Sequence, residues 1–171
     1  MIRKTGIIFL LITMFFSGCE KKGSDIVLPI SEQKIEEAIE YGIKNVELST
    51  PEFVSDWTVD LGFGEGKGSA TLITPFLKAA LLSRQAKLIG QEINRALIKK
   101  ALKEDADCLT FEVLLFGGYP QFGRSVKFVL QYNQKELLPV YTFLPQYSEM
   151  GRDYVQTVKA IVKFKKTDIP A

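Results

Sequence analysis

The chain has 171 residues, of which 46% are hydrophobic and 25% charged; these proportions are typical of one packed domain and exclude a disordered chain. It contains no histidine, and therefore lacks the commonest general base, the commonest metal ligand and the usual pH-sensitive group. The formal net charge of +2 falls to zero without Arg3 and Lys4, which lie in a segment that we expect to be removed, and a neutral domain has no general attraction for nucleic acid.

Residues 1–18 have the three parts of a signal peptide. Arg3 and Lys4 supply positive charge, and Ile7–Phe16 is an apolar run that only Thr13 interrupts. This run is too short to cross a bilayer as a helix, which needs about 20 residues. Ser17 and Gly18 then place small residues directly before Cys19, as a signal peptidase requires.

The sequence Phe16-Ser17-Gly18-Cys19 resembles the lipobox of bacterial lipoproteins, with Phe16 where leucine is usual. The resemblance covers residues 1–19 only. It implies that the Cys19 thiol receives a diacylglycerol, that cleavage occurs just before Cys19, and that the new amino terminus also takes an acyl chain such as palmitate. Two or more acyl chains hold a protein stably on a membrane. The alternative is an ordinary secretory signal that a cysteine happens to follow.

Residues 19–30 are expected to be a lipidated terminus and a short tether. Eleven extended residues reach at most about 35–40 Å. The folded domain, predicted over residues 31–168, should therefore stay close to an inner or outer membrane, outside the cytoplasm.

Three stretches have helical spacing of their apolar residues. Ser31 is a good cap for a helix running to about Asn45. Thr74-Pro75 is a strong helix start, because proline at the first helical position gives up no needed hydrogen bond. This helix ends or kinks at Gly90, and another follows over Gln91–Lys103.

Other stretches alternate as strands do. Val46–Ser49 is a candidate short strand, and Trp57–Phe63 is expected to pair with Ser69–Ile73. Further strands are predicted over 109–116, 125–132, 138–144 and 154–165. The short connections favour antiparallel pairing. The fold class is therefore α+β, an antiparallel β-sheet or sandwich with two or three packed helices.

Cys19 and Cys108 are the two cysteines. If Cys19 carries lipid, Cys108 has no partner in the chain, and we expect no disulfide between them. Cys108 opens an apolar run and is expected to pack as a small hydrophobic residue.

The loops suggest little chemistry. The glycine-rich stretch 62–69 lacks the spacing of a phosphate-binding loop and lies between strands, so we interpret it as a hairpin loop. In the stretch 117–124, Tyr119, Phe122 and Arg124 stand among glycines and form a candidate binding loop. The alternative is a wide turn whose aromatic side chains fold back over the core. The stretch 139–147 has similar aromatic and proline content.

These observations favour a non-catalytic envelope lipoprotein that binds or organises another envelope component, with no cofactor, metal or nucleic acid. A second hypothesis is a lipoprotein that binds a small molecule, lipid or glycan between helices and sheet. A hydrolase without histidine is the third.

Overall fold

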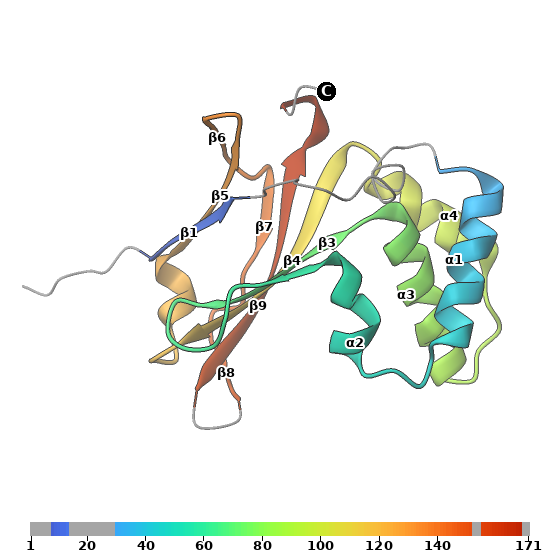
Figure 1. Ribbon diagram of the computed structural model, residues 1–171, viewed down its shortest axis with the longest axis horizontal. Coiled ribbons are helices and arrows are strands. Elements are labelled where there is room, and N and C mark those ends of the chain that lie inside the picture. The colour runs from blue at the N-terminus through green and yellow to red at the C-terminus, as the bar shows by residue number, and fades with distance from the viewer. Residues whose placement is uncertain (1–7, 14–29, 152–154, 169–171) are drawn as a thin grey trace, which may run out of the picture. The chain divides into compact units, whose positions relative to one another are not determined.

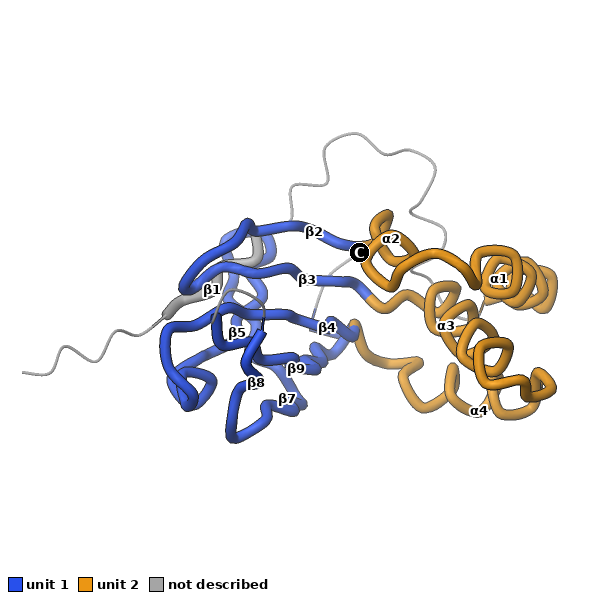
Figure 2. Tube along the Cα trace, turned by 90° about the horizontal axis from the view of Figure 1, so that it is seen from below, with its two compact units in different colours: residues 1–15, 58–72, 110–171 blue, residues 16–57, 73–109 orange. Residues whose placement is uncertain are grey.

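The computed structural model describes residues 8–13, of which the backbone alone is considered, together with residues 30–151 and 155–168 (Figure 1). The chain divides into two compact units (Figure 2). The sheet unit comprises residues 1–15, 58–72 and 110–171, and the helical unit comprises residues 16–57 and 73–109. The predicted α+β class is confirmed. The prediction of one domain over 31–168 stays a prediction.

The helical unit begins with α1, Glu32–Lys44, at the place that the sequence predicts. The Ser31 hydroxyl accepts a hydrogen bond from the Lys34 backbone N–H over 3.2 Å, which satisfies one of the free donors at the helix start. Ile35, Ala38 and Ile39 are buried on one face.

The next element is the short helix α2, Thr50–Val54, followed by one 3₁₀ turn, Ser55–Trp57. The prediction of a strand over Val46–Ser49 is therefore wrong. Ser49 is the cap of α2: its hydroxyl accepts from the Glu52 N–H, and the Glu52 carboxylate accepts from the Ser49 N–H. This reciprocal capping starts a helix at a place where the alternation of apolar and polar residues alone predicts a strand.

Helices α3, Pro75–Leu88, and α4, Arg95–Glu104, complete the unit. Thr74 caps α3 as predicted, with its hydroxyl 3.1 Å from the Leu77 nitrogen. The chain leaves α3 at Gly90, whose φ of +67° favours glycine,. Helix α4 starts later than predicted because Asn94, and not Gln91, caps it.

The core of the helical unit is made of buried apolar side chains from α1, α2, α3 and α4: Ile35, Ala38, Ile39, Phe53, Leu77, Ala79, Ala80, Ile98 and Leu102. Helices α1 and α3 approach closely at Gly42, where a Cβ atom would lie 2.3 Å from the Ala80 carbonyl oxygen. No side chain fits there, so glycine sets the distance between the two helices.

Arg84 of α3 is buried inside this unit, at 9% exposure. Its guanidinium donates to the Leu48 carbonyl oxygen and lies 4.9 Å from the centre of the Phe53 ring. Its Nε has no hydrogen-bond partner. The ring face and the carbonyl dipole thus provide the favourable electrostatics for a buried cation.

Ion pairs cover the outside of the helical unit. Arg95 Nε and Glu36 Oε1 are 2.7 Å apart, and Lys99 Nζ lies 2.7 Å from Glu32. The hydrogen bond from Arg95 holds the pKa of Glu36 below its usual value. These exposed pairs link α4 to α1 and contribute little energy each.

The sheet unit contains a sheet of six strands. Its order is β2-β3-β4-β9-β7, and β8 also pairs with β9. The bounds are β2 Thr58–Asp60, β3 Gly68–Ile73, β4 Cys108–Gly117, β7 Tyr141–Phe143, β8 Glu149–Met150 and β9 Gln156–Lys165. The predicted pairing of β2 with β3 is confirmed, with Asp60 opposite Ser69.

Strands β2 and β7 are shorter than predicted. β2 ends at Asp60 because its carboxylate accepts from the Gly62 N–H over 2.8 Å, which turns the chain into the 61–67 loop,. The sequence predicted a strand from Leu138, but β7 begins at Tyr141, because Pro139 has no N–H to donate,.

Strands β4 and β9 lie at the centre of this sheet and bury alternate residues. Phe111 and Phe164 are buried from the two strands, with ring centres 5.9 Å apart in an edge-to-face arrangement. Cys108, predicted to be a buried small hydrophobic residue, is only half-buried at the start of β4, and its thiol is free.

A second sheet in the same unit has the order β1-β5-β6, with bounds β1 Ile8–Thr13, β5 Val126–Tyr132 and β6 Lys135–Leu137. β5 and β6 form a hairpin whose two turn residues, Asn133 and Gln134, have positive φ. β1 pairs with β5 in parallel. The remainder of the predicted signal peptide and tether, residues 1–7 and 14–29, lies outside the described residues. No described helix is long and apolar enough to cross a membrane.

The close contact at Gly42 predicts that a single added methyl group lowers the free energy of unfolding. Gly42→Ala should lower the free energy of unfolding by about 1–3 kcal/mol, because α1 or α3 must move to admit the Cβ. Glu40→Ala, on the exposed side of the same helix, should change it by less than about 0.5 kcal/mol. Both changes are measured by urea unfolding of the chain without residues 1–19, monitored by far-ultraviolet circular dichroism. Equal stability of the two variants would show that the helices can separate freely at this point.

Candidate functional site: an aromatic loop pair on the sheet unit

The stretch that the sequence marks as a candidate binding loop connects β4 to β5. It contains a 3₁₀ turn, Phe122–Ser125, immediately before β5. Within it, Phe122 is only 1% exposed. Its ring packs on the backbone of Gly117, where a Cβ atom would lie 2.2 Å from the Phe122 Cγ atom. Phe122 is therefore a core residue, as the alternative interpretation of this stretch predicts.

Tyr119 and Arg124 differ from Phe122 in being exposed. The Ser125 hydroxyl donates to the Phe122 carbonyl oxygen over 2.9 Å, so the Tyr119 hydroxyl, 2.8 Å away, donates to Ser125. The Tyr119 and Phe122 rings meet edge to face, with their centres 6.4 Å apart. The buried ring and these hydrogen bonds hold Tyr119 in place while leaving its face open.

The connection from β7 to β9, which includes the short strand β8, lies against the first loop. The Ser148 N–H donates to the Pro120 carbonyl oxygen over 2.9 Å, and the Ser148 hydroxyl donates to the buried Gln156 side chain over 2.6 Å. The Arg124 guanidinium lies 5.6 Å from the centre of the Tyr147 ring. We call residues 118–125 and 144–151 the loop pair.

The loop pair carries three exposed side chains, Tyr119, Arg124 and Tyr147, which we call the aromatic surface. Tyr147 is 60% exposed, although Arg124 lies over its ring. Two of the three residues predicted from sequence, Tyr119 and Arg124, are exposed, whereas Phe122 is buried with its ring against Tyr119. Sequence reasoning did not find Ser148, because its bond to Pro120 joins residues 28 apart.

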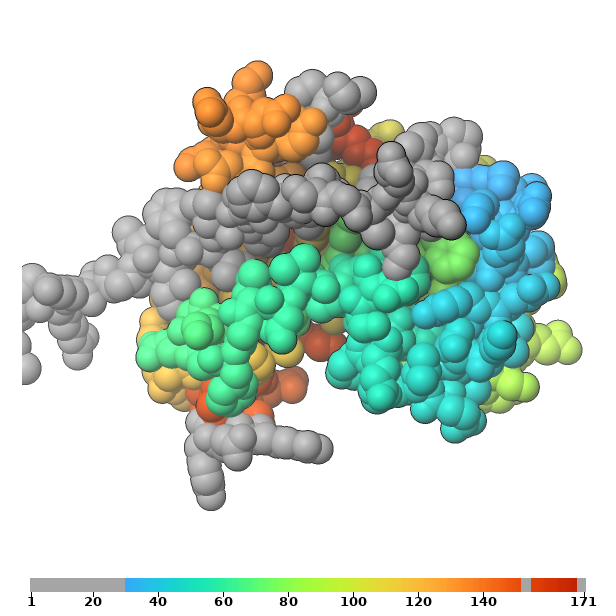
Figure 3. All heavy atoms as spheres, in the orientation of Figure 1, coloured from blue at the N-terminus to red at the C-terminus, as the bar shows by residue number. Residues whose placement is uncertain are grey.

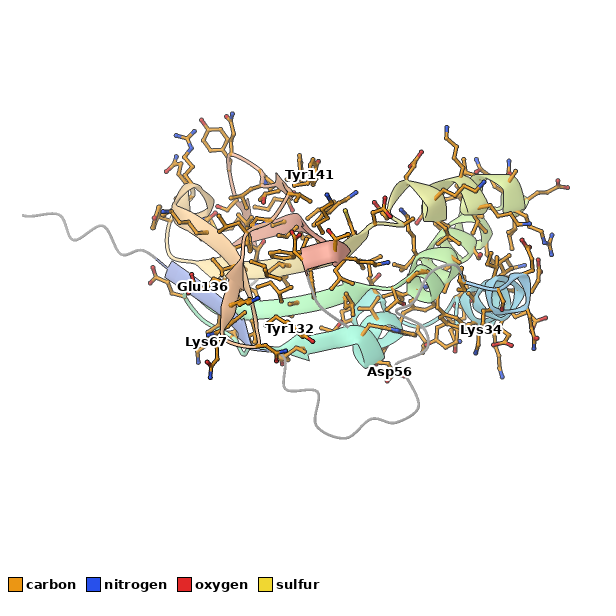
Figure 4. All side chains as sticks on the ribbon, turned by 90° about the horizontal axis from the view of Figure 1, so that it is seen from above. Lys34, Asp56, Lys67, Tyr132, Glu136 and Tyr141 are labelled. Carbon is orange, nitrogen blue, oxygen red and sulfur yellow. The ribbon has the colours of Figure 1, made fainter. Side chains whose placement is uncertain are left out.

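The edge strand β7 adds a second exposed apolar group to the sheet unit. Tyr141 (Figure 4) and Phe143 are exposed and lie opposite Lys163 and Ile161 of β9. Lys163 Nζ lies 5.4 Å from the centre of the Tyr141 ring. Leu138, which follows β6, is also exposed. The orange atoms at the upper left of Figure 3 lie where Figure 1 labels β6.

The 61–67 loop beside β4 is a hairpin loop, as predicted. The Gly66 N–H donates to the Phe116 carbonyl oxygen over 3.0 Å, and the Phe63 and Phe116 ring centres are 4.8 Å apart. Hydrogen bonds and a ring contact thus bring this loop onto the end of β4, and it connects two strands, as the interpretation requires.

Across the described residues, no group of three Cys, Asp or Glu side chains is placed to hold a metal ion. Cys19, the predicted lipidation site, lies outside the described residues. A comparison of the chain with protein-family models, with curated proteins and with solved structures finds no match.

Gly117 and Gly118 form a matched pair for testing how the aromatic surface is supported. Gly117→Ala should cost about 1–3 kcal/mol of unfolding free energy, because its Cβ would overlap the Phe122 ring. At Gly118 the new Cβ would meet the end of the Glu65 side chain at 3.2 Å, which can swing away, so Gly118→Ala should cost less than about 0.5 kcal/mol. Urea unfolding of both variants provides the measurement. A larger loss for Gly118→Ala would contradict this account of the loop.

Proposed function

We propose that the protein is a lipoprotein of the bacterial envelope, anchored through Cys19, and that its sheet unit binds another envelope component through the aromatic surface. The anchor rests on the likeness of Phe16-Ser17-Gly18-Cys19 to a lipobox. The binding role rests on the aromatic surface.

The observation that supports binding is that two exposed tyrosines and an arginine lie on loops already held in place. Tyrosine and arginine are enriched at the centres of protein interfaces, where they give a large contact area and polar contacts together. Loops fixed by hydrogen bonds and by a buried ring lose little conformational entropy when a partner binds. Tyr119 and Tyr147 come from different loops, and the hydrogen bond from Ser148 to Pro120 joins these loops.

The anchor also limits where the partner is. A tether of about 35–40 Å at full extension keeps the domain within reach of the membrane surface. The partner should therefore be a component of the envelope close to that surface.

Lipidation is tested by growing producing cells with radioactive palmitate. The wild-type protein should take up label, Cys19→Ala should take up none, and Cys108→Ala should remain labelled because Cys108 is part of strand β4. Label that persists in Cys19→Ala, or a wild-type protein without label, would refute the anchor.

Binding through the aromatic surface is tested with a photo-crosslinking amino acid in place of Tyr147 in intact cells. A defined crosslinked product should form at Tyr147, and it should weaken several-fold with Gly117→Ala, which disturbs the support of the loop. The control position is Lys100, an exposed residue of α4 in the helical unit. Equal crosslinking from Tyr147 and Lys100 would argue against a binding surface on the loop pair.

A further inference from the structure

Strand β5 has two neighbours that cover it unequally. On one side β6 pairs with the last three residues, from Leu130 to Tyr132. On the other side β1 pairs in parallel with six residues, from Val126 to Gln131. The β1 side is therefore the longer and more regular edge of β5.

The side chains of β5 are those of an interior strand. Phe128, Val129 and Leu130 are consecutive and are 5%, 7% and 5% exposed. Because successive residues of a strand point to opposite faces, both faces of β5 are buried at its centre. Exposed edge strands are usually protected by charges, prolines or bulges, and Lys127 is the only charged residue between Val126 and Tyr132.

Maturation of this chain as a lipoprotein would remove β1. Cleavage before Cys19 separates Ile8–Thr13 from the domain, and the six paired positions of β5 lose their neighbour. About three N–H and three C=O groups of an edge of this length then face outward without backbone partners. A strand built for the interior of a sheet would become an open edge.

We propose that in the mature protein this edge of β5 binds an extended apolar segment of a partner protein in the envelope, in the parallel register that Ile8–Thr13 occupies. The inference rests on the proposed function, because it requires cleavage before Cys19. Backbone hydrogen bonds along the added strand provide the affinity, and pockets for alternate side chains provide the selectivity.

The chemistry of the partner follows from the segment that occupies the edge. Ile-Phe-Leu-Leu-Ile-Thr has no charge and no proline, and β-branched residues stand at both ends. A partner segment should share these properties over about six residues, since this is an ordinary strand length. The edge also begins at Val126, directly after the turn that carries Arg124, so one partner can contact the aromatic surface and the edge together.

The experiment uses the mature lipidated protein, purified from membranes in detergent, with its mass showing whether residues 1–18 are gone. The probe is a synthetic peptide of residues 6–13 with a short lysine tail for solubility. Phe9 lies opposite Lys127, and partners in adjacent strands are close enough for a disulfide. The peptide therefore carries Phe9→Cys and the protein carries Lys127→Cys with Cys108→Ala.

Mild oxidation should join this peptide to the protein at least tenfold faster than a peptide with Ile12→Cys, whose register partner is Leu130. Two further peptides carry N-methyl groups on alternate residues, one on 8, 10 and 12, the other on 9, 11 and 13. One set should abolish the reaction and the other should leave it nearly unchanged, because only alternate N–H groups face β5.

The contrary outcomes are distinct. Equal rates for all the peptides would mean contact without strand addition and would overturn the proposal while leaving the lipid anchor intact. A disulfide between two protein copies at Lys127→Cys, which excess peptide does not displace, would overturn it in favour of self-pairing. A purified protein that retains residues 1–18 would overturn both the proposed maturation and the open edge.

Discussion

The contact of the Phe122 ring with the backbone of Gly117 is the constraint on which the candidate site depends. Any side chain at Gly117 would occupy the space of the ring. Tyr119 and Arg124, on either side of Phe122 in the chain, are exposed, and the Tyr119 ring rests against the Phe122 ring. The contact also fixes the end of the connection from β4, and hence where β5 starts. A single buried ring thus organises both surfaces that we assign to binding.

The parts of the fold that depend on neighbouring residues were predictable from sequence. Ser31 and Thr74 cap helices because their hydroxyl groups meet an N–H three residues later, and the alternation along β9 marks its buried face without reference to any other strand. Ser49 shows the limit of alternation: a Ser-x-x-Glu pattern was present there, but the alternating stretch Val46–Ser49 before Pro51 resembled a strand. The reciprocal hydrogen bonds between Ser49 and Glu52 start a helix there. The capping pattern was therefore a better predictor than the alternation.

The parts that depend on distant residues were not predictable. The burial of Phe122 among exposed neighbours follows from its contact with Gly117 and from the bond between Ser148 and Pro120. β6 and β8 have three and two residues, too few for a period to be visible, and they exist because β5 and β9 offer them backbone partners. For the predicted binding loop, the composition showed that aromatic residues are concentrated there. Which of these residues are exposed depends on contacts with distant parts of the chain.

The division of the chain into two units has a consequence for the order in which its parts can fold as the chain emerges. All the described residues of the helical unit precede residue 110, so this unit can close as soon as that part of the chain has emerged. The large sheet cannot, because β9 lies between β4 and β7 and is the last strand to appear. Until β9 has emerged, β4 lacks one of its two neighbouring strands. Units that close early shield their own apolar surface from aggregation while the rest of the chain is still arriving.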